Sequence, residues 1–179
     1  MTSIRAADPR LGAPFLDAFD GQSYAAMFDH TSGVPGRALV FDRLVMALAR
    51  TQRSGTAVGV LLFRIADSFD DRAVCKASEI VDRELRADDT IGRIGPHEFV
   101  GICHLRDYQE VQVVVRRMAQ VFERIGAATS VTIRTAVGGA NDDAADLLAS
   151  AARAIETPLA DAIRPNSSQM YADVLWPKR

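Results

Sequence analysis

Arg86 and Asp89 are the charged residues whose types and spacing best suit recognition of a ligand. A guanidinium group can donate two parallel hydrogen bonds to O6 and N7 of a guanine base, and a nearby carboxylate can accept from the guanine N1 and N2 donors. The pattern R-x-x-D is weakly specific by itself, because it also occurs at residues 5–8 and 64–67. The alternative interpretation is a surface ion pair at a helix end, which contributes roughly a few tenths of a kcal/mol.

The stretch GPHEF, residues 95–99, is a second candidate site because it combines a glycine turn with His97 and Glu98. We expect His97 to be a turn residue exposed to water. His104 lies seven positions further on, so in one extended strand the two imidazoles point to opposite faces and cannot share a metal ion. Glu98 is expected to be a structural carboxylate, since a general base needs a bound substrate to act on. The histidines therefore predict no metal site.

The elements that must position these residues follow from hydrophobic periodicity. Apolar residues recur at helical spacing in four segments, in which we expect Val45 and Ile155 to face the core. Shorter apolar or β-branched runs predict the strands. The predicted helices are residues 35–54, about 70–85, 108–125 and 142–155, and the predicted strands are 57–65, 90–94, 99–105, 130–137 and 170–176. After the first helix the order is β-α-β-β-α-β-α-β, whose core is the ferredoxin-like split arrangement.

Three stretches of the chain, taken in order, resemble the GGDEF family of diguanylate cyclases. DHTSGVPGR at residues 29–37 is similar to the family's opening motif, and RADDTIGRIGPHEF at residues 86–99 is similar, without a gap, to the segment that contains the GGDEF signature. Residues 131–137, followed by residues 146–152, resemble the late strand and the helix after it. The resemblance implies an α/β fold, a ferredoxin-like palm with a mainly antiparallel sheet flanked by helices. It assigns residues 29–179 to a degenerate GGDEF domain and residues 1–28 to an N-terminal arm or linker.

Several positions depart from the family pattern. Pro96 replaces the second glycine of the signature and removes an N–H where the backbone would face phosphate. His97 replaces the acidic metal-binding residue, and an imidazole is a poor substitute for the oxygen ligands that Mg²⁺ prefers. Arg64 falls near the family's metal-binding Asp, where a cation opposes metal binding. Gly95, Glu98 and Phe99 remain as matches. The resemblance therefore predicts a retained hairpin and no catalytic residues.

The resemblance also implies a role for one pair of matched residues. Arg86 and Asp89 lie where the family has its inhibitory site, which binds cyclic di-GMP. The leading interpretation is a catalytically inactive, regulatory or cyclic di-GMP-sensing domain of bacterial signalling that works with a protein partner or as a homodimer. One alternative is a divergent diguanylate or nucleotidyl cyclase that uses GTP and Mg²⁺ with a rearranged set of Asp67, Asp71 and Glu98. The other is a ligand-free scaffold that docks a partner through the arm.

Composition excludes several other classes of protein. The net charge is −2 without a basic run, which argues against binding of nucleic-acid polymers. No apolar stretch approaches the roughly 20 residues of a membrane span, and the N-terminus lacks the apolar core of a signal peptide. Cys75 and Cys103 lie in apolar segments without metal-ligand spacing, so we expect buried, reduced thiols. We therefore expect a cytoplasmic protein without a cofactor.

Overall fold

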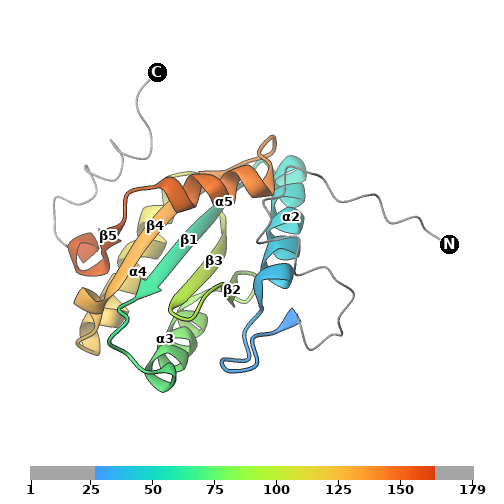
Figure 1. The fold of residues 1–179 in the computed structure, drawn as a ribbon. Coiled ribbons are helices and arrows are strands. Elements are labelled where there is room, and N and C mark those ends of the chain that lie inside the picture. The colour runs from blue at the N-terminus through green and yellow to red at the C-terminus, as the bar shows by residue number, and fades with distance from the viewer. Residues whose placement is uncertain (1–26, 164–179) are drawn as a thin grey trace.

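A computed structural model describes residues 27–163 of the chain, and within them five strands form one antiparallel sheet in the order β2-β3-β1-β4-β5 (Figure 1). The strands are β1 (Ala57–Ile65), β2 (Thr90–Arg93), β3 (Glu98–Leu105), β4 (Val131–Gly138) and β5 (Thr157–Pro158). β1 lies in the centre, where it pairs with β3 on one side and β4 on the other. The order of the first four strands is that of the ferredoxin-like split arrangement, as predicted.

Helices cover both faces of this sheet (Figure 1). α3 (Asp71–Glu84) and α4 (Glu110–Arg124) pack on one face, together with the short helices η3 (Ala128–Ser130) and η4 (Leu159–Ile163). α2 (Arg37–Ser54) and α5 (Ala144–Arg153) pack on the other face. The apolar core is thus divided by the sheet into two layers. This architecture confirms the predicted fold class, a mainly antiparallel sheet flanked by helices.

The central strand β1 owes its position to an apolar run that is buried on both sides. Leu61 and Phe63 face α3 and α4, whereas Val58 and Val60 face α2 and α5. Such alternation is what a strand between two helical layers requires, since successive side chains point to opposite faces. Arg64, near the end of the strand, breaks the pattern and is exposed.

Local sequence also determines where the helices begin and end. Asp70 precedes α3 and accepts a hydrogen bond from the backbone N–H of Ala73 at 2.8 Å, which satisfies one of the free donors in the first turn. Asp143 does the same for α5 through the N–H of Ala145 at 2.8 Å. α2 ends at Gly55, whose φ of 68° suits a residue without Cβ. The start of α3 matters for the site below, because it places Asp71.

Within the described residues the predicted elements are recovered in order, and two side chains differ from their predicted burial. Val45 is 43% exposed although it continues the apolar stripe of α2. Ile155 is 64% exposed because α5 ends at Arg153, before the turn that would bring this side chain inward. The last described strand is β5, at Thr157–Pro158; the strand expected at residues 170–176 lies outside the described residues, as do residues 1–26 of the arm.

Both cysteines are free thiols, as expected. Cys103 is buried in the core, whereas Cys75 is only half-buried, which corrects the expectation of two buried thiols. Among residues 27–163, no helix has the length and apolar composition needed to cross a bilayer.

Candidate functional site

The signature turn joins β2 to β3 as a tight hairpin. The backbone N–H groups of Ile94 and Gly95 both donate to the carbonyl oxygen of Glu98, at 2.9 and 3.2 Å. A Cβ at Gly95 would lie 2.9 Å from a carboxylate oxygen of Glu98, which would have to move aside. Phe99 is buried in the core. The hairpin predicted for residues 95–99 is therefore present, and core packing of Phe99 anchors it.

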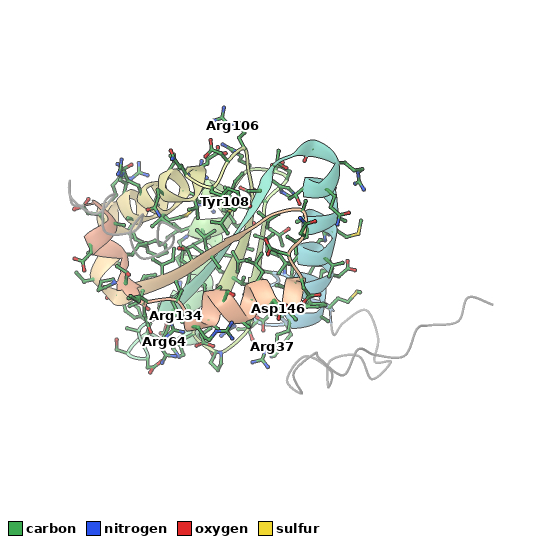
Figure 2. All side chains as sticks on the ribbon, turned by 90° about the horizontal axis from the view of Figure 1, so that it is seen from above. Arg37, Arg64, Arg106, Tyr108, Arg134 and Asp146 are labelled. Carbon is green, nitrogen blue, oxygen red and sulfur yellow. The ribbon has the colours of Figure 1, made fainter. Side chains whose placement is uncertain are left out.

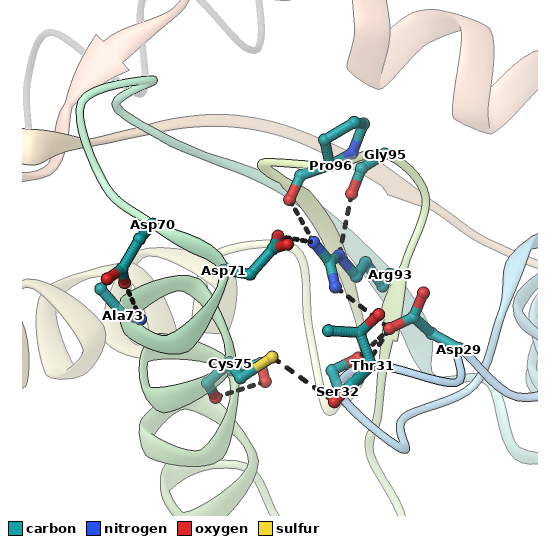
Figure 3. A network of polar contacts seen from close by, with 11 residues as sticks. Asp29, Thr31, Ser32, Asp70, Asp71, Ala73, Cys75, Arg93, Gly95 and Pro96 are labelled. Carbon is teal, nitrogen blue, oxygen red and sulfur yellow. Dashed lines mark hydrogen bonds and ion pairs between the residues drawn. The ribbon is translucent and has the colours of Figure 1, made fainter.

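Arg93 holds this turn from below, as Figure 3 shows. Its guanidinium group donates to the carbonyl oxygens of Gly95 at 3.1 Å and of Pro96 at 2.6 Å. It also forms ion pairs with Asp29 at 3.1 Å and with Asp71 at 3.3 Å. The side chain is only 6% exposed. Arg93 thus ties three segments together: the loop before α2, the start of α3 and the signature turn.

Asp29 is held in place for its ion pair with Arg93 by hydrogen bonds within its own turn. It accepts hydrogen bonds from the N–H and the hydroxyl of Ser32, at 2.8 and 2.7 Å. Burial raises the pKa of Asp29, but the bonds from Ser32 and Arg93 outweigh burial and leave this pKa below its usual value. The carboxylate therefore stays ionised opposite Arg93. Sequence reasoning missed this role of Arg93, although the residue lies within the matched stretch 86–99.

Arg64 lies beside the same turn and pairs with two carboxylates. Its guanidinium donates to Glu98 at 3.3 Å and to both oxygens of Asp67 at 3.0 and 2.9 Å. The contact with Glu98 follows from the register, since the two residues face each other across β1 and β3. Arg134 on β4 lies near Arg64 (Figure 2) and pairs with Glu156. This corner of the sheet is therefore a network of alternating charges.

Each of the three carboxylates considered for a rearranged metal site forms an ion pair with an arginine. Asp67 and Glu98 are both paired with Arg64, and Asp71 is paired with Arg93. Within the described part of the chain, no group of three or more His, Cys, Asp or Glu residues gathers as metal ligands would. His97 is half-buried and its Nδ1 is buried without a hydrogen-bond partner, which corrects the expectation of a water-exposed turn residue.

Arg86 and Asp89 lie at the opposite end of β3 from the signature turn. The two side chains do not pair with each other. Asp89 accepts from the backbone N–H of Arg86 at 3.0 Å and from that of His104 at 2.9 Å, so it fixes the connection between α3 and β2 onto β3. The Arg86 guanidinium donates to Glu110 at 2.7 Å and to the carbonyl oxygen of His104 at 3.4 Å. Arg86 remains 46% exposed.

Arg117, on α4, is a further cationic residue whose charge acts on this end of the sheet. Its Nε and Nη2 atoms are buried and have no hydrogen-bond partner. Burial raises the pKa of the Cys103 thiol and Asp89 raises it further, whereas Arg117 and Arg86 lower it. The charges of these three side chains thus all act on one buried thiol. The sequence offers no signal for Arg117, because an arginine in an amphipathic helix is usually a surface residue.

The fold is that of solved GGDEF domains. The GGDEF domain of DgcB from Caulobacter crescentus, solved in complex with c-di-GMP, matches 69% of this chain and 84% of its own, with a TM-score of 0.58 and 15% identity. Diguanylate cyclase SiaD from Pseudomonas aeruginosa, solved with its activator SiaC, matches 77% of this chain and 58% of its own, with a TM-score of 0.62 and 20% identity. The FimX GGDEF domain from Pseudomonas aeruginosa matches 77% of this chain and 94% of its own, with a TM-score of 0.60 and 13% identity.

No protein-family model and no curated protein matches the chain. The likeness to the solved structures therefore establishes the fold: this chain has the fold of GGDEF domains, as the resemblance of its three stretches predicted.

Proposed function

We propose that the chain is a catalytically silent, regulatory GGDEF-like domain that binds cyclic di-GMP through Arg86, Asp89 and Arg117. The observation that carries this proposal is the half-exposed guanidinium group of Arg86, which lies beside Asp89 at the end of β3. Arg117 is a further candidate because two of its N–H donors are buried without a partner. Leaving such donors unsatisfied costs about 1–3 kcal/mol, so turning Arg117 outward onto an anionic ligand would be favourable.

The three side chains match the chemistry of a guanine nucleotide. Asp89 accepts one backbone hydrogen bond on each oxygen, so lone pairs remain on both for the N1 and N2 donors of guanine. Arg86 is half-exposed and can present two parallel N–H groups to O6 and N7. Arg117 supplies a second fork that suits phosphate or a base edge. Cyclic di-GMP offers both kinds of group, two guanines and two phosphates.

The proposal that the domain is catalytically silent rests on Arg64. A GGDEF cyclase needs Mg²⁺ beside the signature turn, and Mg²⁺ requires free carboxylate oxygens. Here the guanidinium of Arg64 pairs with Asp67 and Glu98, offsets one of their two negative charges and occupies the oxygens that a cation would need. The residues present therefore do not fit the metal. The divergent cyclase considered from the sequence has no observation in its favour, because each of its three carboxylates is paired with an arginine.

The neighbouring structures support the ligand and a protein partner without deciding either. DgcB was solved with c-di-GMP and SiaD with its activator SiaC. A domain of this fold can therefore hold the dinucleotide and can work with a regulator protein. We propose that the bound state of this chain acts on a protein partner or on a second copy of the chain.

Calorimetric titration of the purified chain with cyclic di-GMP tests the ligand. We expect saturable binding that Arg86→Ala abolishes and that Arg117→Ala weakens by about tenfold or more, equivalent to about 1.4 kcal/mol. Arg83→Ala is the matched control: this exposed arginine lies three residues before Arg86 and pairs with Glu79 on the surface of α3. Its affinity should equal that of the wild type.

Two results would overturn the proposal in different ways. Absence of heat at high ligand concentration would remove the sensing function. Production of cyclic di-GMP from GTP with Mg²⁺ or Mn²⁺, measured by chromatography, would show that the domain is not catalytically silent and would favour the cyclase alternative.

A further inference from the structure

The guanidinium group of Arg86 is already engaged by a carboxylate of its own chain. Nη2 donates to Oε1 of Glu110 at 2.7 Å, and Nη1 donates to the carbonyl oxygen of His104 at 3.4 Å. Arg86 is 46% exposed, whereas Glu110 is 8% exposed. The more mobile partner of this ion pair is thus the arginine, and the carboxylate lies beneath it.

Glu110 is held in place without help from Arg86. Its Oε2 accepts a hydrogen bond from the backbone N–H of Arg106 at 2.7 Å. It is the first residue of α4, where the positive end of the helix favours a carboxylate. The bonds from Arg106 and Arg86 lower the pKa of Glu110 to about 2, so the group is ionised at every physiological pH. Glu110 is therefore a fixed anion next to the ligand site.

A second arginine, Arg106, can take the place of Arg86 beside Glu110. The guanidinium group of Arg106 lies 3.5 Å from the same Oε1 of Glu110 and is 84% exposed, so it is loosely held and free to move closer. Departure of Arg86 would leave Glu110 with the Arg106 N–H and this second guanidinium. The buried carboxylate would then keep a charged partner, and the cost of opening the pair stays small.

We propose that Glu110 competes with the ligand for Arg86. The Arg86–Glu110 ion pair, here called the latch, holds Arg86 away from the ligand, and on ligand binding Glu110 exchanges Arg86 for Arg106 as its partner. The inference rests on the proposed binding of a guanine nucleotide at Arg86 and Asp89. The reason is geometric: bidentate contact with a guanine edge needs two neighbouring N–H groups, and Glu110 occupies one of the terminal nitrogens. The latch sets the affinity of the site and gives a partner that contacts Glu110 or Arg106 a means of changing it.

Glu110→Gln tests the latch, because the amide retains an oxygen for the Arg106 N–H and loses the charge that holds Arg86. In titrations with cyclic di-GMP we expect Glu110→Gln to bind about tenfold more tightly than the wild type. Arg106→Ala should bind about threefold more weakly, since Glu110 then depends on Arg86 alone. Glu79→Gln is the control: its carboxylate pairs with Lys76 and Arg83 on the surface of α3, and its affinity should not change.

A second measurement needs no ligand. Phenylglyoxal modifies accessible guanidinium groups, and peptide mass spectrometry reports the rate at each arginine. We expect Arg86 to react faster in Glu110→Gln than in the wild type, whereas Arg83 reacts equally in both.

The two measurements separate failure of the latch from failure of the proposed function. If the wild type binds cyclic di-GMP and Glu110→Gln binds it equally or more weakly, the latch is wrong and the ligand stands. If neither protein binds, the ligand is wrong, and an unchanged reaction rate of Arg86 then overturns the latch as well. Faster modification with no binding would keep the latch and direct the search to another anionic ligand.

Discussion

Arg93 shows how one buried side chain organises the signature turn. It meets two carbonyl oxygens, two carboxylates and the ring of Phe99, whose centroid lies 5.8 Å from the guanidinium carbon. Asp29, one of the carboxylates, lies 64 positions earlier in the chain. A buried cation with these partners is stable because carboxylates, carbonyl oxygens and the face of an aromatic ring all attract a positive charge.

Removing Arg93 should therefore destabilise the whole domain. Arg93→Ala leaves Asp29 and two turn carbonyls without their donor, and loss of one partner of a buried pair costs about 3 kcal/mol. Urea unfolding followed by far-ultraviolet circular dichroism measures the free energy of unfolding. Arg43→Ala, on the exposed face of α2, is the control and should change it by less than about 0.5 kcal/mol. Equal effects of the two substitutions would contradict the role of Arg93.

The sequence shows which charged residue stands at each position, but it does not show which charged residues form ion pairs. The replacement of expected residues by Arg64, Pro96 and His97 was visible directly. That Arg64 reaches Glu98, 34 positions away, depends on the register between β1 and β3. The pairing of Arg86 with Glu110 likewise depends on where α4 begins relative to α3. Ion pairs between different elements have no periodic signature, because the attraction depends on how far apart the folded chain places the two charges.

At the scale of elements, α2 and the segment before it pack closely against β2. A Cβ added to Gly92 would collide with Val40 of α2 and would lie 2.6 Å from the carbonyl oxygen of Pro35. The same oxygen accepts a hydrogen bond from the N–H of Arg93 at 2.8 Å, so the segment before α2 is held against the edge of the sheet. Gly92 is thus required for close approach of two backbones.

Gly92→Ala should separate these elements and lower the free energy of unfolding by about 2 kcal/mol, as other overpacking substitutions do. Gly101→Ala is a matched control on β3, because its Cβ would meet the Phe63 ring at 3.4 Å and Leu61 at 3.7 Å, which are ordinary contact distances. We expect Gly101→Ala to leave the midpoint of urea unfolding nearly unchanged. If both variants unfold at the same urea concentration, the tight contact at Gly92 is not what the structure indicates.

Most elements could be predicted because their cause is local. The apolar run of β1 and the stripe of α4 each follow a period of a few residues. Val45 and Ile155 were placed wrongly for a related reason. An apolar residue at the edge of a stripe is buried only if a neighbouring element covers it, and periodicity carries no information on how far that element extends.

At the scale of the whole molecule, β3 separates two sites. Glu98, which pairs with Arg64, begins this strand, and the backbone of His104, which contacts Arg86 and Asp89, lies near its end. At about 3.3 Å per residue the two places are roughly 20 Å apart. A ligand at Arg86 therefore cannot touch the signature turn of the same domain.

Restoring the signature alone should not create a cyclase. In the double variant P96G/H97D the turn regains the glycine and the acidic residue of the family pattern, but Arg64 still pairs with Glu98 and Asp67. We expect no cyclic di-GMP from GTP with Mg²⁺ or Mn²⁺, as measured by chromatography. The titration of the double variant with cyclic di-GMP serves as its control, and should match the wild type because Arg86 and Asp89 are distant. Turnover by the double variant would show that Arg64 does not exclude the metal.

The sequence by itself determined the order of the elements, the hairpin at residues 95–99 and the family-like spacing from Arg86 to Phe99. These features depend on neighbours in the chain, through periodicity, turn residues and motif spacing. Only the tertiary structure decided the partners: Arg64 with Glu98, Arg93 with Asp29, Arg86 with Glu110, and the unsatisfied donors of Arg117. These partners could not be read from the sequence because they lie far apart in the chain. They meet only when their helices and strands pack together, and packing depends on the whole chain.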